Sequence, residues 1–235
     1  MIGEVATAAA KTLEVSAKVA ETTKKVGDVV DITRRIDITA TATEVKPGVD
    51  ISKRIVPDKA KLMDYTGKEL TAKQKNELVE KGFSKGILGD CTYKDGIVKL
   101  KTQYNKLENR VCPGTDVKYV RKAVDLMGTK IEGVFPEFKS AFTTFLPDNI
   151  LMASDGKQFN YCIKSLQNEI KNNPALSKKF SARELEQIKA GKTPSGFTWH
   201  HNEMPGKMEL VKSDIHDTAK HTGGRAVWGG GGIHR

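Results

Sequence analysis

The stretch "FTWHHNEMPGKMELVKSDIHDTAKHTGG", residues 197–224, decides the fold that the sequence predicts for the C-terminal part of the chain. Residues 197–201 are aromatic, β-branched and imidazole side chains, which together have strand character. Pro205 and Gly206 form the centre of a turn. Residues 208–211 then have the composition of a returning strand. The stretch therefore begins as a β-hairpin.

A short helix is expected directly after the hairpin, over residues 214–221. Ser213 is a suitable N-cap, and Gly223 a suitable residue to end the helix. The histidines concentrate in the same region, because all five in the chain lie between residues 200 and 235. They are His200, His201, His216, His221 and His234. The order strand, turn, strand, helix thus places histidines on the first strand and on the helix.

This arrangement suits metal-assisted chemistry on a phosphodiester. Neutral imidazoles are good ligands for zinc and similar cations. Adjacent strand residues point to opposite sides, so His200 and His201 cannot share one role in a regular strand. One imidazole could bind a metal that polarises a phosphate, while the other takes a proton from the attacking water. The residues therefore predict phosphodiester hydrolysis.

The motif "TWHH…PGKMELV…IHDTAKHTGGRAVWG" resembles the HNH, or His-Me finger, nuclease superfamily. More narrowly, it resembles the WHH-type nuclease domains at the C-termini of bacterial polymorphic toxins. The strong resemblance covers about 35 residues, and a weaker one extends it to about 85. The resemblance implies a C-terminal ββα-metal motif in an α+β chain that is otherwise mainly helical.

The resemblance also implies roles for the histidines. His200 would be a metal ligand, His201 the general base and His216 a second ligand. His221 would be a third ligand, but it follows His216 by five residues, about 140° around an ideal helix. A metal ligand, a phosphate contact and a helix C-cap therefore all stay open for His221. The asparagine of the HNH pattern has no clear counterpart before the helix, since Asn202 comes too early.

Other residues near the motif allow two interpretations each. Arg225 could hold the scissile phosphate in a bidentate contact or be a surface arginine. Glu203 could assist the metal, although an ordinary turn carboxylate is the preferred interpretation. Trp199 and Trp228 are expected to pack in the core, and the run "GGGGIHR" to be a mobile tail. The contacts expected with nucleic acid are Lys207, Lys212, Lys220 and Arg225.

One divalent metal ion is expected as cofactor. Three imidazoles favour zinc or nickel, whereas two imidazoles with water ligands would allow magnesium or manganese. The net charge of +10 and the pI near 9.4 are typical either of a polyanionic partner (nucleic acid, an anionic membrane or an acidic protein) or of a solvated surface with many lysines, and charge alone does not choose between them. No apolar run approaches the roughly 18 residues of a transmembrane segment. A monomer is expected.

The rest of the chain is predicted to form two further regions. Residues 1–57 contain helical spacing over 5–29, followed by a linker or edge strand. Residues 58–147 are predicted to be a small α-rich region like the pre-toxin segments of such proteins, and residues 148–235 to be the nuclease domain. Cys91, Cys112 and Cys162 are expected to be buried thiols, with one disulfide left open.

Several local signals lie within the two C-terminal regions. Thr71 with Gln74, and Ser181 with Glu184, form candidate capping boxes. Asp155 is expected to cap a helix in which Gln158 takes the third position, with Pro174 just beyond its end. Asp95-Gly96 predicts a hairpin turn. "VKYVRKAVDLMG", residues 117–128, is amphipathic and predicts a helix that ends at Gly128. "VFPEFKSAFTTFLPDN", residues 134–149, holds four of the eight phenylalanines and predicts core packing.

The sequence as a whole predicts a metal-dependent, non-specific endonuclease, preferably a DNase. The resemblance places it at the toxin end of a longer, secreted bacterial protein that acts in the target-cell cytoplasm, and it implies an acidic immunity protein as partner. An RNase or tRNase on the same fold is the nearest alternative. A non-enzymatic module that binds metal or nucleic acid is the second.

Overall fold

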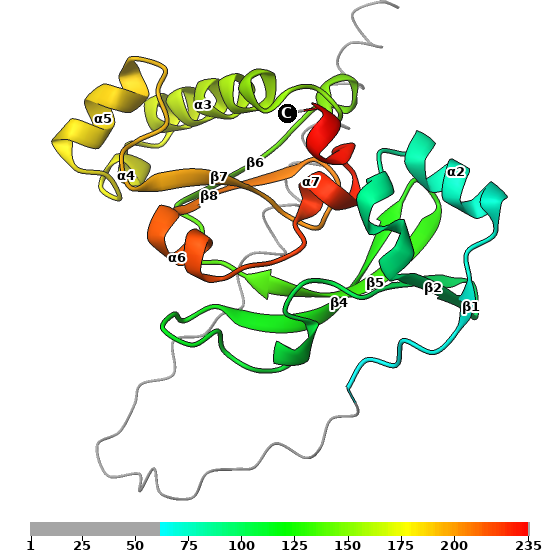
Figure 1. Ribbon diagram of the computed structural model, residues 1–235. Coiled ribbons are helices and arrows are strands. Elements are labelled where there is room, and N and C mark those ends of the chain that lie inside the picture. The colour runs from blue at the N-terminus through cyan, green and yellow to red at the C-terminus, as the bar shows by residue number, and fades with distance from the viewer. Residues whose placement is uncertain (1–61, 235) are drawn as a thin grey trace, which may run out of the picture. The chain divides into compact units, whose positions relative to one another are not determined.

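The computed structural model describes residues 62–234, which lie within one compact unit (Figure 1). The expectations for residues 1–57 lie outside the described residues. The boundary predicted between residues 147 and 148 falls inside the unit. Two antiparallel-rich sheets with helices packed against them make the described part an α+β fold, as predicted, but this part is rich in sheet and is not mainly helical as expected.

The first sheet has five strands in the order β1-β2-β3-β5-β4, and all neighbours are antiparallel except β3 and β5. Two helices separate β1 from β2 in the chain: α2 (Ala72–Glu80) and the 3₁₀ helix η1 (Lys85–Asp90). A second 3₁₀ helix, η2 (Asn105–Leu107), separates β3 from β4. The strands are β1 (Lys68–Glu69), β2 (Cys91–Lys94), β3 (Ile97–Leu100), β4 (Lys118–Leu126) and β5 (Thr129–Glu137). The region expected to be α-rich is therefore built mainly from strands.

The helix predicted over residues 117–128 is the clearest correction. The stretch forms β4, in which Val124 and Leu126 are buried on one face, two residues apart, and Tyr119 is buried on the opposite face in a second cluster. Met127 and Gly128 have φ angles of 48° and 82°, which is the backbone of a two-residue hairpin turn rather than of a helix end. A period of two with β-branched residues favours a strand, and Gly128 is a turn residue in that setting.

Other local predictions are confirmed. The Asp95-Gly96 turn joins β2 to β3. Both capping boxes are present, at Thr71 for α2 and at Ser181 for α5 (Ala182–Lys189). Each box lets a side chain accept from an otherwise unpaired N–H of the first helical turn, so these boundaries are decided locally. Cys91, Cys112 and Cys162 are buried free thiols, which settles the question of a disulfide.

The second sheet has three antiparallel strands in the order β6-β8-β7. The predicted strand over residues 197–201 is β7 (Phe197–His201), and the returning strand is β8 (Lys207–Lys212). The third strand, β6 (Phe142–Phe145), comes from the phenylalanine-rich stretch and pairs with β8 across more than 60 residues of chain. The hairpin register places His200 opposite Glu209.

Helices cover this second sheet on both faces (Figure 1). On one face lies α3 (Asp155–Asn172), preceded by the 3₁₀ helix η3 (Asp148–Ile150) and followed by α4 (Pro174–Ser177) and α5. Ser154 is the N-cap of α3 and accepts from Lys157 N, so the predicted cap, Asp155, is instead the first helical residue. Pro174 follows the end of α3, as predicted. On the other face lies α6 (Ser213–Thr218).

The C-terminal segment differs from its prediction in two ways. Helix α6 ends at Thr218, three residues earlier than expected, and Ser213 is its first residue rather than its cap. The glycine run is not a free tail: α7 (Gly224–Val227) and the 3₁₀ helix η4 (Gly231–His234) follow, and Gly230 N donates to Gly82 O at 2.6 Å. This segment packs against the turn after α2.

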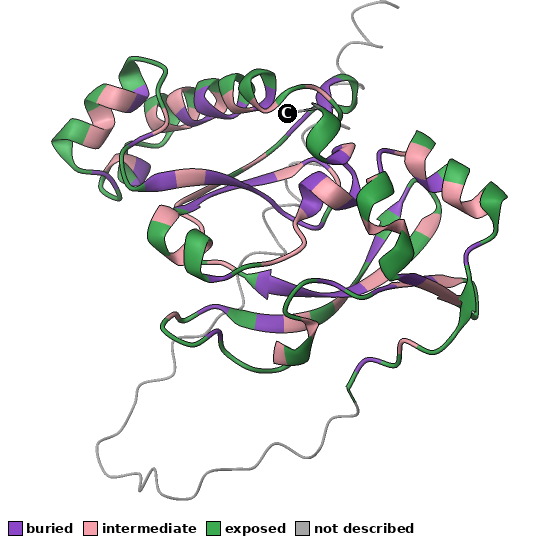
Figure 2. Ribbon diagram, viewed as in Figure 1, coloured by how far each residue is buried: buried purple, intermediate pink, exposed green. Residues whose placement is uncertain are grey.

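One large core joins the two sheets, and Figure 2 shows its buried residues on the strands and on the inner faces of the helices. Trp199 and Trp228 are buried in it, which confirms their predicted packing role. Trp228 Nε1 donates to Asn202 O, and a Cβ on Gly224 would come within 1.9 Å of that oxygen. Only glycine at position 224 permits this approach. None of the helices between residues 62 and 234 has the length and apolar composition of a membrane span.

Candidate metal centre and active site

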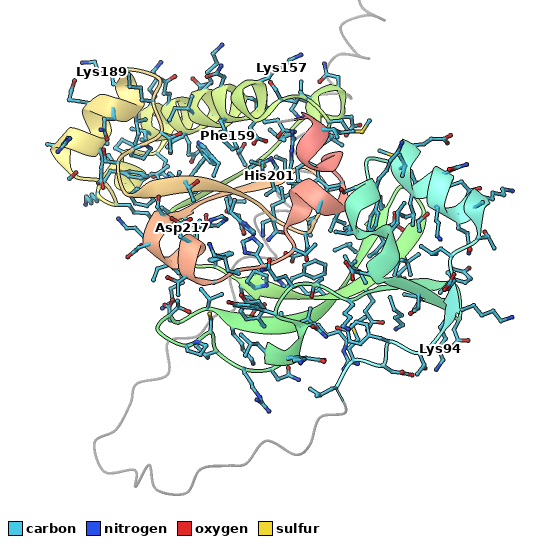
Figure 3. The ribbon with its side chains drawn as sticks, in the orientation of Figure 1. Lys94, Lys157, Phe159, Lys189, His201 and Asp217 are labelled. Carbon is cyan, nitrogen blue, oxygen red and sulfur yellow. The ribbon has the colours of Figure 1, made fainter. Side chains whose placement is uncertain are left out.

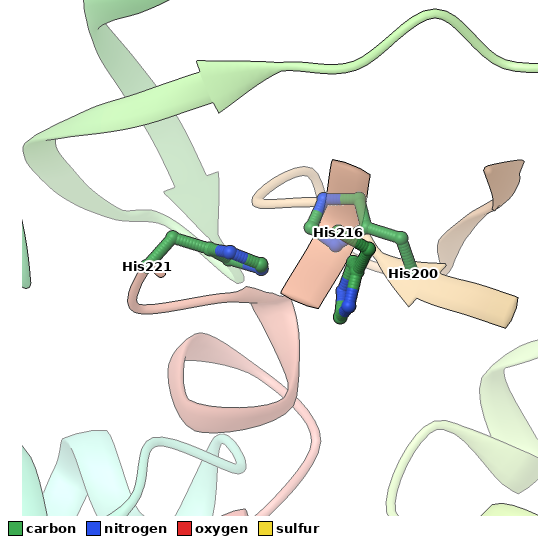
Figure 4. Close-up of side chains that lie close together, drawn as sticks. All are labelled: His200, His216 and His221. Carbon is green, nitrogen blue, oxygen red and sulfur yellow. The ribbon is translucent and has the colours of Figure 1, made fainter. Parts of the chain in front are cut away.

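Three histidine side chains converge beside β7. His200 comes from β7, His216 from α6, and His221 from the loop that follows α6. One ligand nitrogen from each ring lies within 4.8 Å of the other two. The ring centroids are separated by 5.4 Å for His200 and His216, 4.8 Å for His200 and His221, and 5.0 Å for His216 and His221. Figure 4 shows the three rings turned toward a common point.

The early end of α6 explains why His221 joins the group. A five-residue separation on a continuous helix would turn His221 away from His216, as the sequence suggested. The chain leaves the helix at Ala219, with φ −83° and ψ 75°, and then turns back toward β7. His221 is therefore not a helix C-cap. Its Nδ1 lies 2.7 Å from Ala219 O, and because a carbonyl only accepts, Nδ1 carries the proton and Nε2 carries the lone pair.

His200 is the most buried member, with 2% of its surface exposed. Among residues 62–234, no hydrogen-bond partner reaches its buried Nε2. A buried polar nitrogen without a partner costs free energy, and such atoms are rare in folded proteins. A cation shared with His216 and His221 would satisfy this nitrogen. The group thus has the chemistry of a metal site.

Phe138 forms one wall of this site and was missed from the sequence. It follows β5, and its ring centroid lies 4.7 Å from His200, 5.4 Å from His216 and 5.3 Å from His221. The four phenylalanines of residues 134–149 differ in their exposure, so the prediction that they pack in the core is confirmed only in part. Phe135 is buried in the core, whereas Phe145 is 54% exposed. An aromatic wall excludes water and limits how far the three imidazoles can rotate.

The electrostatic setting keeps all three imidazoles neutral. Burial is the main cause that lowers the pKa of His200 well below its usual value, and neighbouring His221 and His216 lower it further. Burial also lowers the pKa of His216, with a smaller opposing effect from Asp217. Burial lowers the pKa of His221 to about 4. Neutral imidazole is the form that binds a metal.

These shifts predict an acid-sensitive apoprotein. In the unfolded chain a histidine takes up a proton near pH 6.5, whereas folded His221 resists protonation to about pH 4. Between these two pH values the unfolded state binds more protons than the folded state. The contribution of His221 to the free energy of unfolding is therefore greatest above pH 6.5, and it decreases as the pH falls toward 4. His221 alone contributes at most about 3 kcal/mol.

Urea unfolding in EDTA at pH 7, 6 and 5 measures this dependence. Few carboxylates titrate in that window, so the slope reports the histidines. We expect a lower unfolding free energy at each step, and a smaller slope for His221→Asn, which cannot titrate. An unfolding free energy that stays constant from pH 7 to pH 5 would contradict the assignment of buried, neutral imidazoles.

His201 points to the opposite side of β7 from His200, as strand alternation requires. It lies between β7 and α3, with its ring centroid 5.8 Å from Phe159 (Figure 3). Its Nε2 is 2.8 Å from Gln158 Oε1. Sequence reasoning placed Gln158 only as the third residue of a helix, but its side chain is fully buried and contacts His201. Two sides of one strand thus supply two different chemical environments.

The hydrogen bonds of Gln158 fix which nitrogen of His201 holds the proton. Gln158 Nε2 donates to Ile150 O at 2.9 Å and to Leu151 O at 2.7 Å. Arg225 Nη1, which only donates, lies 3.1 Å from Gln158 Oε1. The amide oxygen therefore faces His201, and His201 Nε2 must be the donor. In a neutral ring with a protonated Nε2, the basic nitrogen is Nδ1.

Arg225 is buried, with 6% of its surface exposed, so the interpretation as a surface arginine is wrong. Its Nη1 also donates to Ala153 O at 3.0 Å, and its Nε lies 3.3 Å from Asp155 Oδ1. Asp155 Oδ1 in turn lies 3.9 Å from His201 Nε2. Arg225 and Asp155 thus form, with Gln158, a charged and hydrogen-bonded frame around His201. The Nη1 group of the guanidinium is therefore already hydrogen-bonded within the protein.

The two groups open into one cleft of about 540 Å³. Both His200 and His201 line it, together with His216, His221, Asp155 and Arg225. Of the lysines expected to contact nucleic acid, Lys220 lines the cleft. Lys207 instead pairs with Glu209 at 2.9 Å, and Lys212 lies 3.7 Å from the centre of the Phe197 ring. The three clustered imidazoles, His201 and the cationic groups of Lys220 and Arg225 therefore meet in this cleft.

A buried polar network supports the hairpin behind His200. Glu203 is 5% exposed and accepts from Lys122 Nζ of β4 at 2.8 Å, so it is neither a free turn carboxylate nor one of the clustered ligands. Asn202 Nδ2 donates to Glu209 Oε2 at 3.0 Å, and Asn202 Oδ1 accepts from Met204 N. Asn202 therefore stabilises the turn between β7 and β8, a role that the sequence did not reveal.

Comparison with known proteins connects this site to one family. Residues 127–223 match the model of the family described as the DNase/tRNase domain of colicin-like bacteriocin. The matched range contains β5, β6, the β7–β8 hairpin and all four histidines that line the cleft. Neither a curated protein nor a solved structure gives a significant match. The match supports a nuclease toxin domain in this part of the chain, which acts on nucleic acid.

Proposed function

We propose that this chain is a metal-dependent endonuclease of the HNH, or His-Me finger, type. The observation that carries the proposal is the convergence of three neutral imidazoles in a cleft that also holds His201. The order of β7, β8 and α6, with a histidine on the strand and another on the helix, is the order of a ββα-metal motif. The family match to a DNase/tRNase domain supports the same activity independently.

A divalent metal ion fits the residues present. His200, His216 and His221 would hold it, through Nε2 in the case of His200 and His221. Three nitrogen ligands suit zinc or nickel, whereas magnesium and manganese prefer oxygen-rich sites and would retain more water. Such an ion, when bound, polarises the scissile phosphate and stabilises the leaving oxygen.

His201 is the proposed general base. Its Nε2–H is held by Gln158 Oε1, so Nδ1 is the atom that accepts the proton of the attacking water. Gln158 is in turn held by two backbone carbonyls and by Arg225, which orients the ring of His201. A ring held in one orientation loses less conformational entropy on reaching the reactive geometry, and positioning accelerates a reaction in this way.

Charge supplies the affinity for the polynucleotide. The chain has a net charge of +10, and Lys220 and Arg225 line the cleft. Contacts of this kind act on the phosphate backbone and carry no base information, so cleavage is proposed to be non-specific. DNA is the proposed substrate. RNA, including tRNA, is the alternative, because the description of the matching family names both activities.

The biological setting follows from the same match. We propose that the nuclease is the toxin end of a larger secreted bacterial protein and acts, as a monomer, in the cytoplasm of the target cell. An acidic immunity protein is the proposed partner in the producing cell, since it would complement a basic surface and block the cleft electrostatically.

Incubation of the purified chain with nucleic acid tests this function. Supercoiled plasmid, linear duplex and total tRNA are incubated separately with zinc, nickel, magnesium or manganese, and with EDTA. We expect nicked and then linear plasmid with at least one metal, and intact plasmid in EDTA. Cleavage of tRNA alone would favour the RNase alternative. Intact substrates under every condition, with metal bound, would leave a non-enzymatic binding module.

A further inference from the structure

The third ligand of the proposed metal site is held in place by no helix or strand of its own. His221 lies in the connection between α6, which ends at Thr218, and α7, which begins at Gly224. A ligand on an irregular segment keeps its position only if neighbouring groups fix the backbone on both sides. The hydrogen bonds of this segment therefore decide whether the site is pre-formed.

Strand β4 of the first sheet and the loop between β3 and η2 supply these hydrogen bonds. Tyr119 of β4 donates from its hydroxyl to Lys220 O at 2.6 Å, directly before His221. On the other side of His221, Thr222 Oγ1 accepts from Gln103 N at 2.9 Å. The two contacts flank the ligand and come from residues about 100 positions earlier in the sequence. In Figure 1 the connection between α6 and α7 runs beside this sheet.

Tyr119 is itself rigidly held. Its side chain is fully buried, in a small core cluster that includes Cys112, Val117, Val134 and Ala219. Its backbone N donates to Arg110 O at 2.9 Å, and its carbonyl accepts from Asn109 N at 2.8 Å. The carbonyl oxygen of Ala219, in the same cluster, also accepts a hydrogen bond from Nδ1–H of His221. The buried cluster thus positions both the loop backbone and the imidazole ring.

We propose that Tyr119 is a positioning residue for the metal ligand His221, and that the region containing β4 and the loop after β3 completes the metal site. Tyr119 and Gln103 lie before residue 127, outside the range that matches the nuclease family. The inference rests on the proposed metal site and adds to it the requirement for an upstream element. Groups that orient a ligand commonly contribute 10- to 100-fold to metal affinity.

The test is the zinc affinity of the full chain, measured by competition with a chromophoric chelator. Tyr119→Phe removes one hydroxyl and keeps the ring, and we expect it to weaken zinc binding about tenfold. Tyr161→Phe is the matched control, because Tyr161 is an exposed residue of α3, and it should leave the affinity unchanged. Thr222→Val removes the second flanking contact without loss of volume and should weaken binding several-fold.

A double-mutant cycle separates positioning from general destabilisation. In a His221→Ala background, Tyr119→Phe and Thr222→Val should cause no further loss, because the ligand that they position is gone. An equal loss in that background, or wild-type affinity for Tyr119→Phe, overturns the positioning role. If His221→Ala itself leaves zinc affinity unchanged, the three-imidazole site and the inference built on it both fail.

Discussion

His201→Ala is expected to lower the rate constant of phosphodiester cleavage at pH 7 by about 100- to 10,000-fold, the usual contribution of a general base. Metal affinity should change little, because His201 lies on the α3 side of β7 and the three clustered imidazoles lie on the other. Single-turnover cleavage of a labelled duplex, at saturating metal and enzyme, measures the chemical step. Zinc competition on the same preparation measures the metal site.

Folding is the necessary control, since His201 is buried beside Trp228 and Phe159. His201→Gln keeps most of the volume and can still bond to its neighbours, but it cannot act as a base at pH 7. We expect both variants to show the wild-type circular dichroism spectrum and to bind substrate. Cleavage within about threefold of wild type in either variant contradicts the assignment of His201 as the base.

His200→Ala is expected to affect mainly the metal affinity, in contrast to His201→Ala, which is expected to affect mainly the cleavage rate. Loss of a direct ligand should weaken zinc binding by more than about 100-fold, since even groups that only orient ligands contribute up to that amount. Because a bound metal stabilises the folded state in proportion to the logarithm of its concentration over Kd, the zinc-dependent rise in Tm should shrink as well. Cleavage should fall at low metal and recover in part at high metal.

His201 serves as the matched comparison for His200. The two residues are neighbours on β7, both are buried, and both substitutions remove one imidazole. We expect His200→Ala to change the metal affinity and the zinc-dependent Tm shift, and His201→Ala to change neither. Equal effects of the two substitutions on zinc affinity would mean that strand alternation does not separate the two roles.

Sequence reasoning succeeded where the deciding interactions are local. Both capping boxes, the Asp95-Gly96 turn and the β7–β8 hairpin depend on residues within a few positions of each other. It failed where one pattern fits two structures. Residues 117–128 have an amphipathic composition that suits a helix, yet the Met127-Gly128 turn and the pairing with β5 make a strand. Long-range pairing, as of β6 with β8, has no local signal.

The candidate site was predictable in its histidines and in two cationic residues, Lys220 and Arg225, that line the cleft. The geometric objection to His221 as a ligand came from the assumption that the helix continues, and the early end of α6 removes that objection. Phe138 and Gln158 reach the site through tertiary packing, so their chemistry is invisible in the sequence around them. The contact of Tyr119 was harder still to predict, because its hydroxyl donates to the backbone of a loop that lies near it only in the folded chain.

His200, His216 and His221 are proposed to bind one ion together. A crystal structure of the zinc-loaded chain, with anomalous diffraction recorded on both sides of the zinc absorption edge, tests it most directly. We expect a single strong anomalous peak within about 2.0–2.1 Å of one nitrogen of each of the three rings, the usual zinc–imidazole distance. A peak elsewhere on the protein, or one in contact with fewer than two of these histidines, would contradict it.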